Sequence, residues 1–333
     1  MIKRKSWTKK IPLVPIYACL SAILFLFSGC GNLEISEVLF PISTPEPLED
    51  SAAADEKKYA TITENLPYAT ISDAQTLDLY VPAGEGPFPL VIIIHGGGFM
   101  SGDKAGSNER ARAQFLLNEG YAAASINYRL SDESIYPAQI HDAKTAARFL
   151  RANADKYSLD PVHFGAWGAS AGGTIAALLG TTCGVAELED AELGNAEQSS
   201  CVIAVVDWFG LVDFLKMEEQ FDGTDCLGGF NNADSAESLL VGAPLQTVPE
   251  LVAKTNPINY ISADDAAFFI QHGSNDCRVP PVQSQRLAEA LTDVIGGEKV
   301  IYDQIDGAGH GGQPFRTDEN FHMVISFFDS YLK

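Results

Sequence analysis

Strand-like and helix-like segments alternate along most of the chain. Residues 90–94 form a continuous apolar run, typical of a strand buried on both faces of a parallel sheet, whereas residues 76–81 alternate apolar and polar positions like a half-exposed strand. This alternation predicts an α/β fold in which helices cover both faces of one doubly wound sheet. Further strands are expected at 121–126, 162–167, 202–207, 267–271 and 299–305, and helices at 107–119, 137–157, 171–180, 281–295 and 319–332.

Three segments depart from this pattern. Residues 184–200 and 216–249 are acidic and weakly periodic, so we expect them to form insertions or a small cap above the sheet. Residues 31–58 contain several prolines and lack periodic apolar positions, which is typical of a linker. The globular domain is therefore expected to cover residues 59–333.

The first 30 residues have the pattern of an export signal. Five basic side chains precede an uninterrupted stretch of apolar and small residues at 16–27, which is too short to span a bilayer comfortably. The sequence Phe27-Ser-Gly-Cys30 that follows resembles the lipobox of bacterial lipoproteins, which makes Cys30 the candidate for lipidation. An ordinary cleaved signal and an uncleaved anchor are the alternatives. In each case we expect an exported protein, with a cell-envelope lipoprotein favoured, that contacts the membrane only through this segment.

The composition indicates a globular protein with a strongly acidic surface. Hydrophobic residues make up 46% of the chain, which is enough for a buried core. The formal charge is −22; without the five basic residues of the signal it is −27, from 17 basic and 44 acidic side chains. Such a surface repels phosphate backbones, which argues against nucleic acid as a partner and favours a neutral or apolar substrate.

Four cysteines follow the signal, an even number that is compatible with two disulfides in an exported protein. They are Cys183, Cys201, Cys226 and Cys277. Of the three possible pairings we favour Cys183 with Cys201 and Cys226 with Cys277, because the first pair brackets one short insertion. Four free buried thiols are the alternative. No pair has C-x-x-C spacing, so the cysteines do not predict a metal site.

The sequence around Ser170 carries the clearest chemical motif. Residues 168–172 read G-x-S-x-G and lie between a strand-like run and a helix of small residues. A nucleophile on such a sharp turn needs neighbours without bulk, which Gly168 and Gly172 provide. We therefore interpret Ser170 as the nucleophile of a hydrolase, with a structural glycine-rich turn as the alternative.

A second glycine-rich loop follows the buried strand at 90–94. It begins with His95 and Gly96 and continues through Gly97 and Gly98. Adjacent glycines let backbone amides approach a substrate closely, so we assign an oxyanion hole to the amides of Gly97, Gly98 and Ala171. The loop lacks the lysine and the glycine spacing of a phosphate-binding loop. We expect His95 to support the loop rather than to act as a base.

The general base should lie after the nucleophile in the sequence. Three of the six histidines precede Ser170, and His272 precedes the expected acid, which leaves His310 and His322. His310 lies in a glycine-rich loop directly after a predicted strand, whereas His322 belongs to the last predicted helix. We expect His310 to be the base.

The orienting acid should come between the nucleophile and the base. Asp276 follows the strand expected at 267–271, where a carboxylate can accept a hydrogen bond from His310. Asp303 and Asp306 are the alternatives, but they crowd the loop of the histidine itself.

Six motifs together resemble the α/β-hydrolase esterases and lipases. The group includes the hormone-sensitive-lipase-like esterases and, closer to this sequence, carbohydrate esterases that remove acetyl or feruloyl groups from xylan. The resemblance covers about residues 73–333. The motifs are HGGGF at 95–99, NYRL at 127–130, YPAQ at 136–139, GAWGASAGG at 165–173, HGSND at 272–276 and GAGH at 307–310.

The resemblance implies a central sheet of about eight mostly parallel strands with a small cap or insertions, and a triad of Ser170, Asp276 and His310 above it. It also implies no cofactor and no metal, and a small-molecule or carbohydrate ester as substrate. A serine peptidase of the prolyl-oligopeptidase type shares the triad, but residues 31–73 are too short for the propeller of such enzymes. A non-catalytic cell-surface binding module on the same fold is the alternative from another class.

Overall fold

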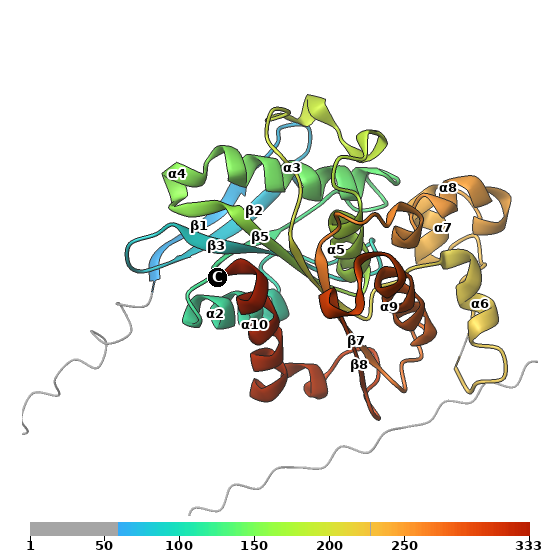
Figure 1. Ribbon diagram of the computed structural model, residues 1–333. Coiled ribbons are helices and arrows are strands. Elements are labelled where there is room, and N and C mark those ends of the chain that lie inside the picture. The colour runs from blue at the N-terminus through green and yellow to red at the C-terminus, as the bar shows by residue number, and fades with distance from the viewer. Residues whose placement is uncertain (1–58, 227) are drawn as a thin grey trace, which may run out of the picture. The chain divides into compact units, whose positions relative to one another are not determined.

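Eight strands form one mixed sheet in the order β1-β2-β4-β3-β5-β6-β7-β8 (Figure 1). Strand β2 is antiparallel to both of its neighbours, and every pairing from β4 to β8 is parallel. This topology confirms the predicted α/β-hydrolase fold. The strands are β1 (Tyr59–Pro67), β2 (Thr76–Pro82), β3 (Phe88–Ile94), β4 (Ala122–Ile126), β5 (Leu159–Ala169), β6 (Ala204–Trp208), β7 (Ala267–Gly273) and β8 (Val300–Ile305).

The computed structural model describes residues 59–226 and 228–333. The predicted signal peptide at 1–30, with Cys30, and the predicted linker at 31–58 lie outside the described residues. None of the described helices has the length and apolar character of a membrane span.

Helices cover both faces of the sheet (Figure 1). Along β3 the buried side chains alternate between two core clusters: Leu90, Ile92 and Ile94 share one cluster with residues of α3, α5 and α9, whereas Val91 and Ile93 share the other with residues of α2 and α10. Burial on both faces explains why this strand is apolar at every position. The helices are α2 (Ser107–Asn118), α3 (Ala138–Ala152), α4 (Ala154–Tyr157), α5 (Ala171–Thr181), α6 (Met217–Gln220), α7 (Ala236–Val241), α8 (Pro249–Ala253), α9 (Val282–Ile295) and α10 (Asp318–Leu332).

Three elements differ from the sequence prediction. The sequence does not predict β1, most of whose residues are exposed or partly exposed at the edge of the sheet. The prediction of a half-exposed strand at 76–81 is wrong, because β2 is buried along nearly its whole length and its Asp78 forms an ion pair with Lys104 at 2.7 Å. The single helix expected at 137–157 is two helices, α3 and α4, which meet at Asn153.

The two acidic segments form insertions between sheet elements. Residues 184–200 contain two short 3₁₀ helices and are closed by the disulfide Cys183–Cys201. Residues 216–249 contain α6 and α7, and the disulfide Cys226–Cys277 joins this segment to the loop that follows β7. Both disulfides have the pairing that the sequence favours.

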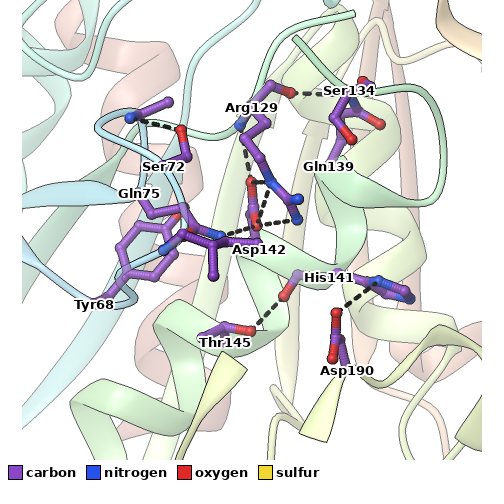
Figure 2. Close-up of polar contacts among 12 residues, drawn as sticks. Tyr68, Ser72, Gln75, Arg129, Ser134, Gln139, His141, Asp142, Thr145 and Asp190 are labelled. Atoms are coloured by element: carbon purple, nitrogen blue, oxygen red, sulfur yellow. Dashed lines mark hydrogen bonds and ion pairs between the residues drawn. The ribbon is translucent and has the colours of Figure 1, made fainter. Parts of the chain in front are cut away.

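A buried ion pair fixes the segment after β4 against α3 (Figure 2). Arg129 Nη2 donates to Asp142 Oδ1 at 2.8 Å, and Gln75 Nε2 donates to the same oxygen at 2.7 Å. Next to this pair, the Tyr128 hydroxyl donates to the carbonyl oxygen of His95 at 3.0 Å, and the two rings stack at 4.4 Å. The NYRL motif therefore supports the glycine-rich loop that begins at His95.

Candidate active site

Ser170 lies on a strained turn between β5 and α5. Its φ of 56° and ψ of −125° are rarely adopted by a residue with a side chain. The Ser170 amide donates to the carbonyl oxygen of Trp208 at 2.9 Å, which ties the turn to the end of β6. The turn places the hydroxyl at the carboxyl edge of the parallel strands, where α/β folds bind ligands.

The two glycines that flank Ser170 are required by close backbone contacts. A Cβ atom at Gly168 would lie 1.9 Å from the carbonyl oxygen of Gly172. A Cβ atom at Gly172 would lie 2.3 Å from the oxygen of Ile94 and 2.6 Å from that of His95. The glycines of the G-x-S-x-G pattern are thus needed because α5 packs closely against the end of β3.

The structure brings His310 and Asp276 together with Ser170. His310 Nδ1 lies 2.6 Å from Asp276 Oδ2, so this nitrogen carries the proton that the carboxylate accepts. His310 Nε2 lies 2.9 Å from Ser170 Oγ and is left to accept from the hydroxyl. The Phe209 ring packs on the imidazole, with the ring centroids 4.7 Å apart. The hydrogen bonds therefore form a continuous chain from carboxylate to hydroxyl.

Asp276 is held as a buried carboxylate. It is 2% exposed, and its Oδ1 accepts from the amides of Arg278 at 2.7 Å and Val279 at 3.0 Å. Burial alone would raise the pKa of Asp276, but hydrogen bonds from His272 and His310 and the Val279 amide outweigh burial and hold it well below its usual range. The carboxylate thus stays ionised at neutral pH and can stabilise a protonated His310.

His272 is a contact of this group that the sequence prediction missed. The imidazole is fully buried, and its Nε2 lies 3.2 Å from Asp276 Oδ2 and 3.1 Å from the carbonyl oxygen of Val279. Both oxygens only accept, so Nε2 carries the proton and Nδ1 accepts from the Ser284 hydroxyl at 2.7 Å. The only indication of this contact in the sequence is that His272 and Asp276 are four residues apart, and the two side chains meet only because of the way the loop folds.

The alternative residues lie apart from His310. Asp303 accepts a hydrogen bond from Gln271 at 2.7 Å, and Asp306 accepts one from Ser274 at 3.3 Å. His322 is exposed on α10, where its Nδ1 contacts the carbonyl oxygen of Asp318.

The glycine-rich loop after β3 lies directly beside the nucleophile turn. A Cβ atom at Gly96 would lie 3.3 Å from the Ser170 Cβ, and one at Gly97 would lie 2.0 Å from the carbonyl oxygen of Ser101. No oxygen of the described residues accepts hydrogen bonds from the amides of Gly97, Gly98 and Ala171. The amide of Ala171 belongs to the first turn of α5, where backbone N–H groups have no acceptor within the helix.

His95 supports this loop, as its position in the sequence suggested. Its Nδ1 donates to the carbonyl oxygen of Gly96 at 2.8 Å. Burial lowers the pKa of His95 despite this hydrogen bond, which keeps the ring neutral near pH 7. A Cβ atom at Gly102 would lie 2.2 Å from the same Nδ1, so the far end of the loop is packed as closely as its start.

Ser170 and His310 open into a cleft of about 1060 Å³. Its lining includes residues 96–98 and 100–102 of the loop after β3, and residues 228–230 and 235–237 of the second insertion. Trp208, Phe315, Phe321 and residues of α2 also line it. Cys277, whose disulfide holds the second insertion, also lines the cleft. Within the ranges that the structure describes, no cluster of His, Cys, Asp and Glu side chains could hold a metal ion.

The topology of the sheet and the placement of this site define an α/β-hydrolase. The BD-FAE family matches residues 77–291, which is more than half of the chain, and the protein belongs to this family.

Curated relatives and solved structures agree with this assignment. The esterase LipC of Mycobacterium tuberculosis is 32% identical over 246 residues, which are 73% of this chain and 58% of LipC. The chain spans little more than half the length of the curated relatives LipC, LipM and LipQ.

Two solved structures are similar over most of this chain. A truncated carbohydrate esterase from gut microbiota has a TM-score of 0.75 at 33% identity, covering 83% of this chain and 98% of that one. A bifunctional GH43-CE protein of Bacteroides eggerthii has a TM-score of 0.74 at 34% identity, covering 82% of this chain and 38% of that protein.

Proposed function

We propose that the protein is a serine carboxylesterase that hydrolyses its substrate through an acyl-enzyme intermediate. The observation that carries this proposal is the chain of hydrogen bonds from Asp276 through His310 to Ser170 at the floor of the cleft. Gly97 and Gly98 follow Gly96, which packs against Ser170, and Ala171 is the next residue after Ser170, so we assign the amides of these three residues, Gly97, Gly98 and Ala171, to the oxyanion of a tetrahedral intermediate.

Each residue has one role in the first half of the reaction. His310 Nε2 takes the proton from Ser170 Oγ as this oxygen bonds to the ester carbonyl carbon. The amides of Gly97, Gly98 and Ala171 hold the resulting oxyanion. The C–O bond to the alcohol then breaks, and the alcohol leaves with the proton from His310. Asp276 stabilises the imidazolium in between.

Water reverses these steps in the second half. His310 removes a proton from the water as its oxygen attacks the acyl carbon, and Ser170 leaves with the proton that His310 returns. The products are the carboxylic acid and the free enzyme.

We propose esters of carbohydrates as the substrate class, with short acyl groups such as acetyl or the aromatic feruloyl group. Two observations support this choice. The two similar solved structures are described as a carbohydrate esterase and a bifunctional GH43-CE protein. The cleft of about 1060 Å³ is also far larger than an acetyl group needs, which leaves room for a bulky alcohol.

Hydrolysis of a panel of substrates tests the proposal. The panel is nitrophenyl acetate, butyrate and decanoate, acetylated xylan, methyl ferulate and a proline peptide amide, each with wild type and Ser170→Ala. We expect release of acetate from xylan, with a loss of at least about 10⁴-fold in kcat for the variant. Cleavage of the peptide amide alone would favour the peptidase, and a folded wild type that cleaves nothing would favour the binding module.

We also propose that the protein is exported as a lipoprotein modified at Cys30. The basic and apolar pattern of residues 1–30 supports export, and two disulfides suit an oxidising compartment. Metabolic labelling with a radioactive fatty acid tests this, since label should enter the wild type and be absent from Cys30→Ala. Equal labelling of both would contradict the proposal.

A further inference from the structure

Glu237 is a buried acid in the cleft that the mechanism does not use. It lies in the first turn of α7, is 6% exposed, and lines the cleft that contains Ser170. None of the ion pairs among the described residues involves it. Burial raises its pKa, opposed by hydrogen bonding at its own amide and at the Ser235 hydroxyl. A carboxylate taken out of water without a cation is costly, which suggests a function.

The position of Glu237 relative to the nucleophile follows from two close contacts. The loop at 96–98 separates them: a Cβ at Gly96 would lie 3.3 Å from the Ser170 Cβ, and one at Gly98 would lie 3.4 Å from the Ala236 Cβ. Ala236 immediately precedes Glu237. Glu237 thus follows a residue that packs on the loop beside Ser170, and its side chain lines the same cleft as the nucleophile.

The wall that carries Glu237 is held in place by specific hydrogen bonds. The Ser235 hydroxyl caps α7 by accepting from the Ser238 amide at 3.1 Å, and it donates to the carbonyl oxygen of Phe230 at 2.8 Å. The Glu218 carboxylate accepts from the amides of Gly229 at 2.9 Å and Phe230 at 2.7 Å. A carboxylate on such a fixed wall can select a ligand by geometry.

The charges around the cleft favour a neutral ligand. Three arginines line it, Arg112, Arg278 and Arg316, and so do three carboxylates, Asp103, Glu109 and Glu237. Because these charges balance, the cleft has no excess negative charge to attract a cation. A carboxylate only accepts hydrogen bonds, so its natural neutral partner is a hydroxyl group.

We propose that Glu237 accepts hydrogen bonds from hydroxyl groups on the alcohol part of the ester, and thereby makes the enzyme selective for esters of sugars over esters of simple alcohols. This inference rests on the proposed esterase function. A site that contains a buried hydrogen-bonding group rejects analogues that lack the matching hydroxyl, because the group is then left without its partner.

A matched pair of acetate esters tests the selectivity. Methyl 3-O-acetyl-xyloside has free hydroxyls next to the ester, whereas cyclohexyl acetate has a ring of similar size and no hydroxyl. The measurement is the ratio of kcat/KM for the xyloside to that for cyclohexyl acetate. In Glu237→Leu we expect this ratio to fall by about 10- to 100-fold, the effect of one hydrogen bond to a charged group.

Two further variants make the test independent of folding. Glu237→Gln keeps the size and one acceptor oxygen, so its ratio should lie between those of wild type and Glu237→Leu. Glu250→Leu removes an exposed carboxylate of α8 and should leave the ratio at the wild-type value.

The possible results separate the two proposals. An unchanged ratio in both Glu237 variants would overturn the role of Glu237 while the esterase function stood. Acetylcholine, assayed as a third acetate ester, has a cationic alcohol and no hydroxyl. A loss of activity in Glu237→Leu that was confined to this ester would overturn the role of Glu237 too, because it would identify a cationic alcohol as the ligand. A folded wild type that hydrolyses none of the esters would refute the esterase function itself.

Discussion

Replacement of Asp207 by asparagine should make the stability of the protein less sensitive to pH. Asp207 lies in β6 and is fully buried. Its Oδ1 accepts from the Gly210 amide at 2.9 Å, but its Oδ2 has no hydrogen-bond partner among the described residues. Burial raises the pKa of Asp207 from 3.8 to about 6, although the Gly210 amide and the nearby His272 act in the opposite direction.

The magnitude follows from this pKa. The folded protein binds the Asp207 proton more tightly than the unfolded chain does. The contribution of this proton to the free energy of unfolding is therefore complete below about pH 4 and is lost as the pH rises to about 6. A rise of the pKa from 3.8 to about 6 corresponds to about 3 kcal/mol. The side-chain amide in Asp207→Asn does not titrate, so this pH-dependent loss should disappear while the acceptor for Gly210 remains.

Urea unfolding of wild type and Asp207→Asn at pH 4.0 and pH 7.5 measures the effect. Between the two pH values, the free energy of unfolding should fall by about 2 to 3 kcal/mol more in the wild type than in the variant. The other titrating groups contribute equally to both proteins, and the cost of burying the amide is the same at both pH values. Neither therefore affects this difference. If the two proteins lost the same stability between pH 4.0 and pH 7.5, Asp207 would not be the buried acid that the structure indicates.

Three further predictions concern the site and its supports. His272→Phe removes a hydrogen bond to the buried Asp276, so kcat/KM on nitrophenyl acetate should fall by about 10- to 100-fold and acid unfolding should begin at higher pH. If neither value changed, His272 would not position Asp276. Gly172→Ala forces a Cβ against two backbone oxygens, so turnover should fall at least about tenfold in a steady-state assay, and normal kcat would contradict the packing of α5. The double variant Cys226→Ser/Cys277→Ser removes a disulfide that spans 51 residues and stabilises the folded protein by about 4 kcal/mol, so Tm measured by calorimetry should fall by about 10 °C. An unchanged Tm would show that this disulfide does not form.

Much of the fold could be predicted because its strands are buried on both faces. Parallel strands such as β3 need apolar side chains at every position, and this pattern is visible in the sequence. The edge strand β1 has exposed side chains and no such pattern. In β2 the polar residue Asp78 reads as a solvent-facing position, but it is buried because Lys104, from a loop 26 residues later, reaches it. The local pattern of apolar and polar residues does not predict an ion pair between residues so far apart in the sequence.

The same distinction holds for the site. Ser170, Asp276 and His310 could be proposed because each lies after a strand, in a motif whose glycines reflect close backbone packing. His272 and Glu237 could not, since their significance comes from neighbours that only the folded chain supplies. Glu237 lies in an acidic stretch that looks like a solvated surface, and only its burial in the cleft distinguishes it from the other carboxylates of that segment.

Covalent labelling of the nucleophile tests whether Ser170 is the residue that forms the acyl-enzyme. The purified protein is treated with a fluorophosphonate probe, digested, and the modified peptide is sequenced by mass spectrometry. We predict that the probe labels Ser170 in the wild type, that labelling is absent in Ser170→Ala, and that it is at least about 100-fold slower in His310→Ala, which lacks the base. Labelling of a different residue, or no labelling of a protein that hydrolyses esters, would show that Ser170 is not the nucleophile.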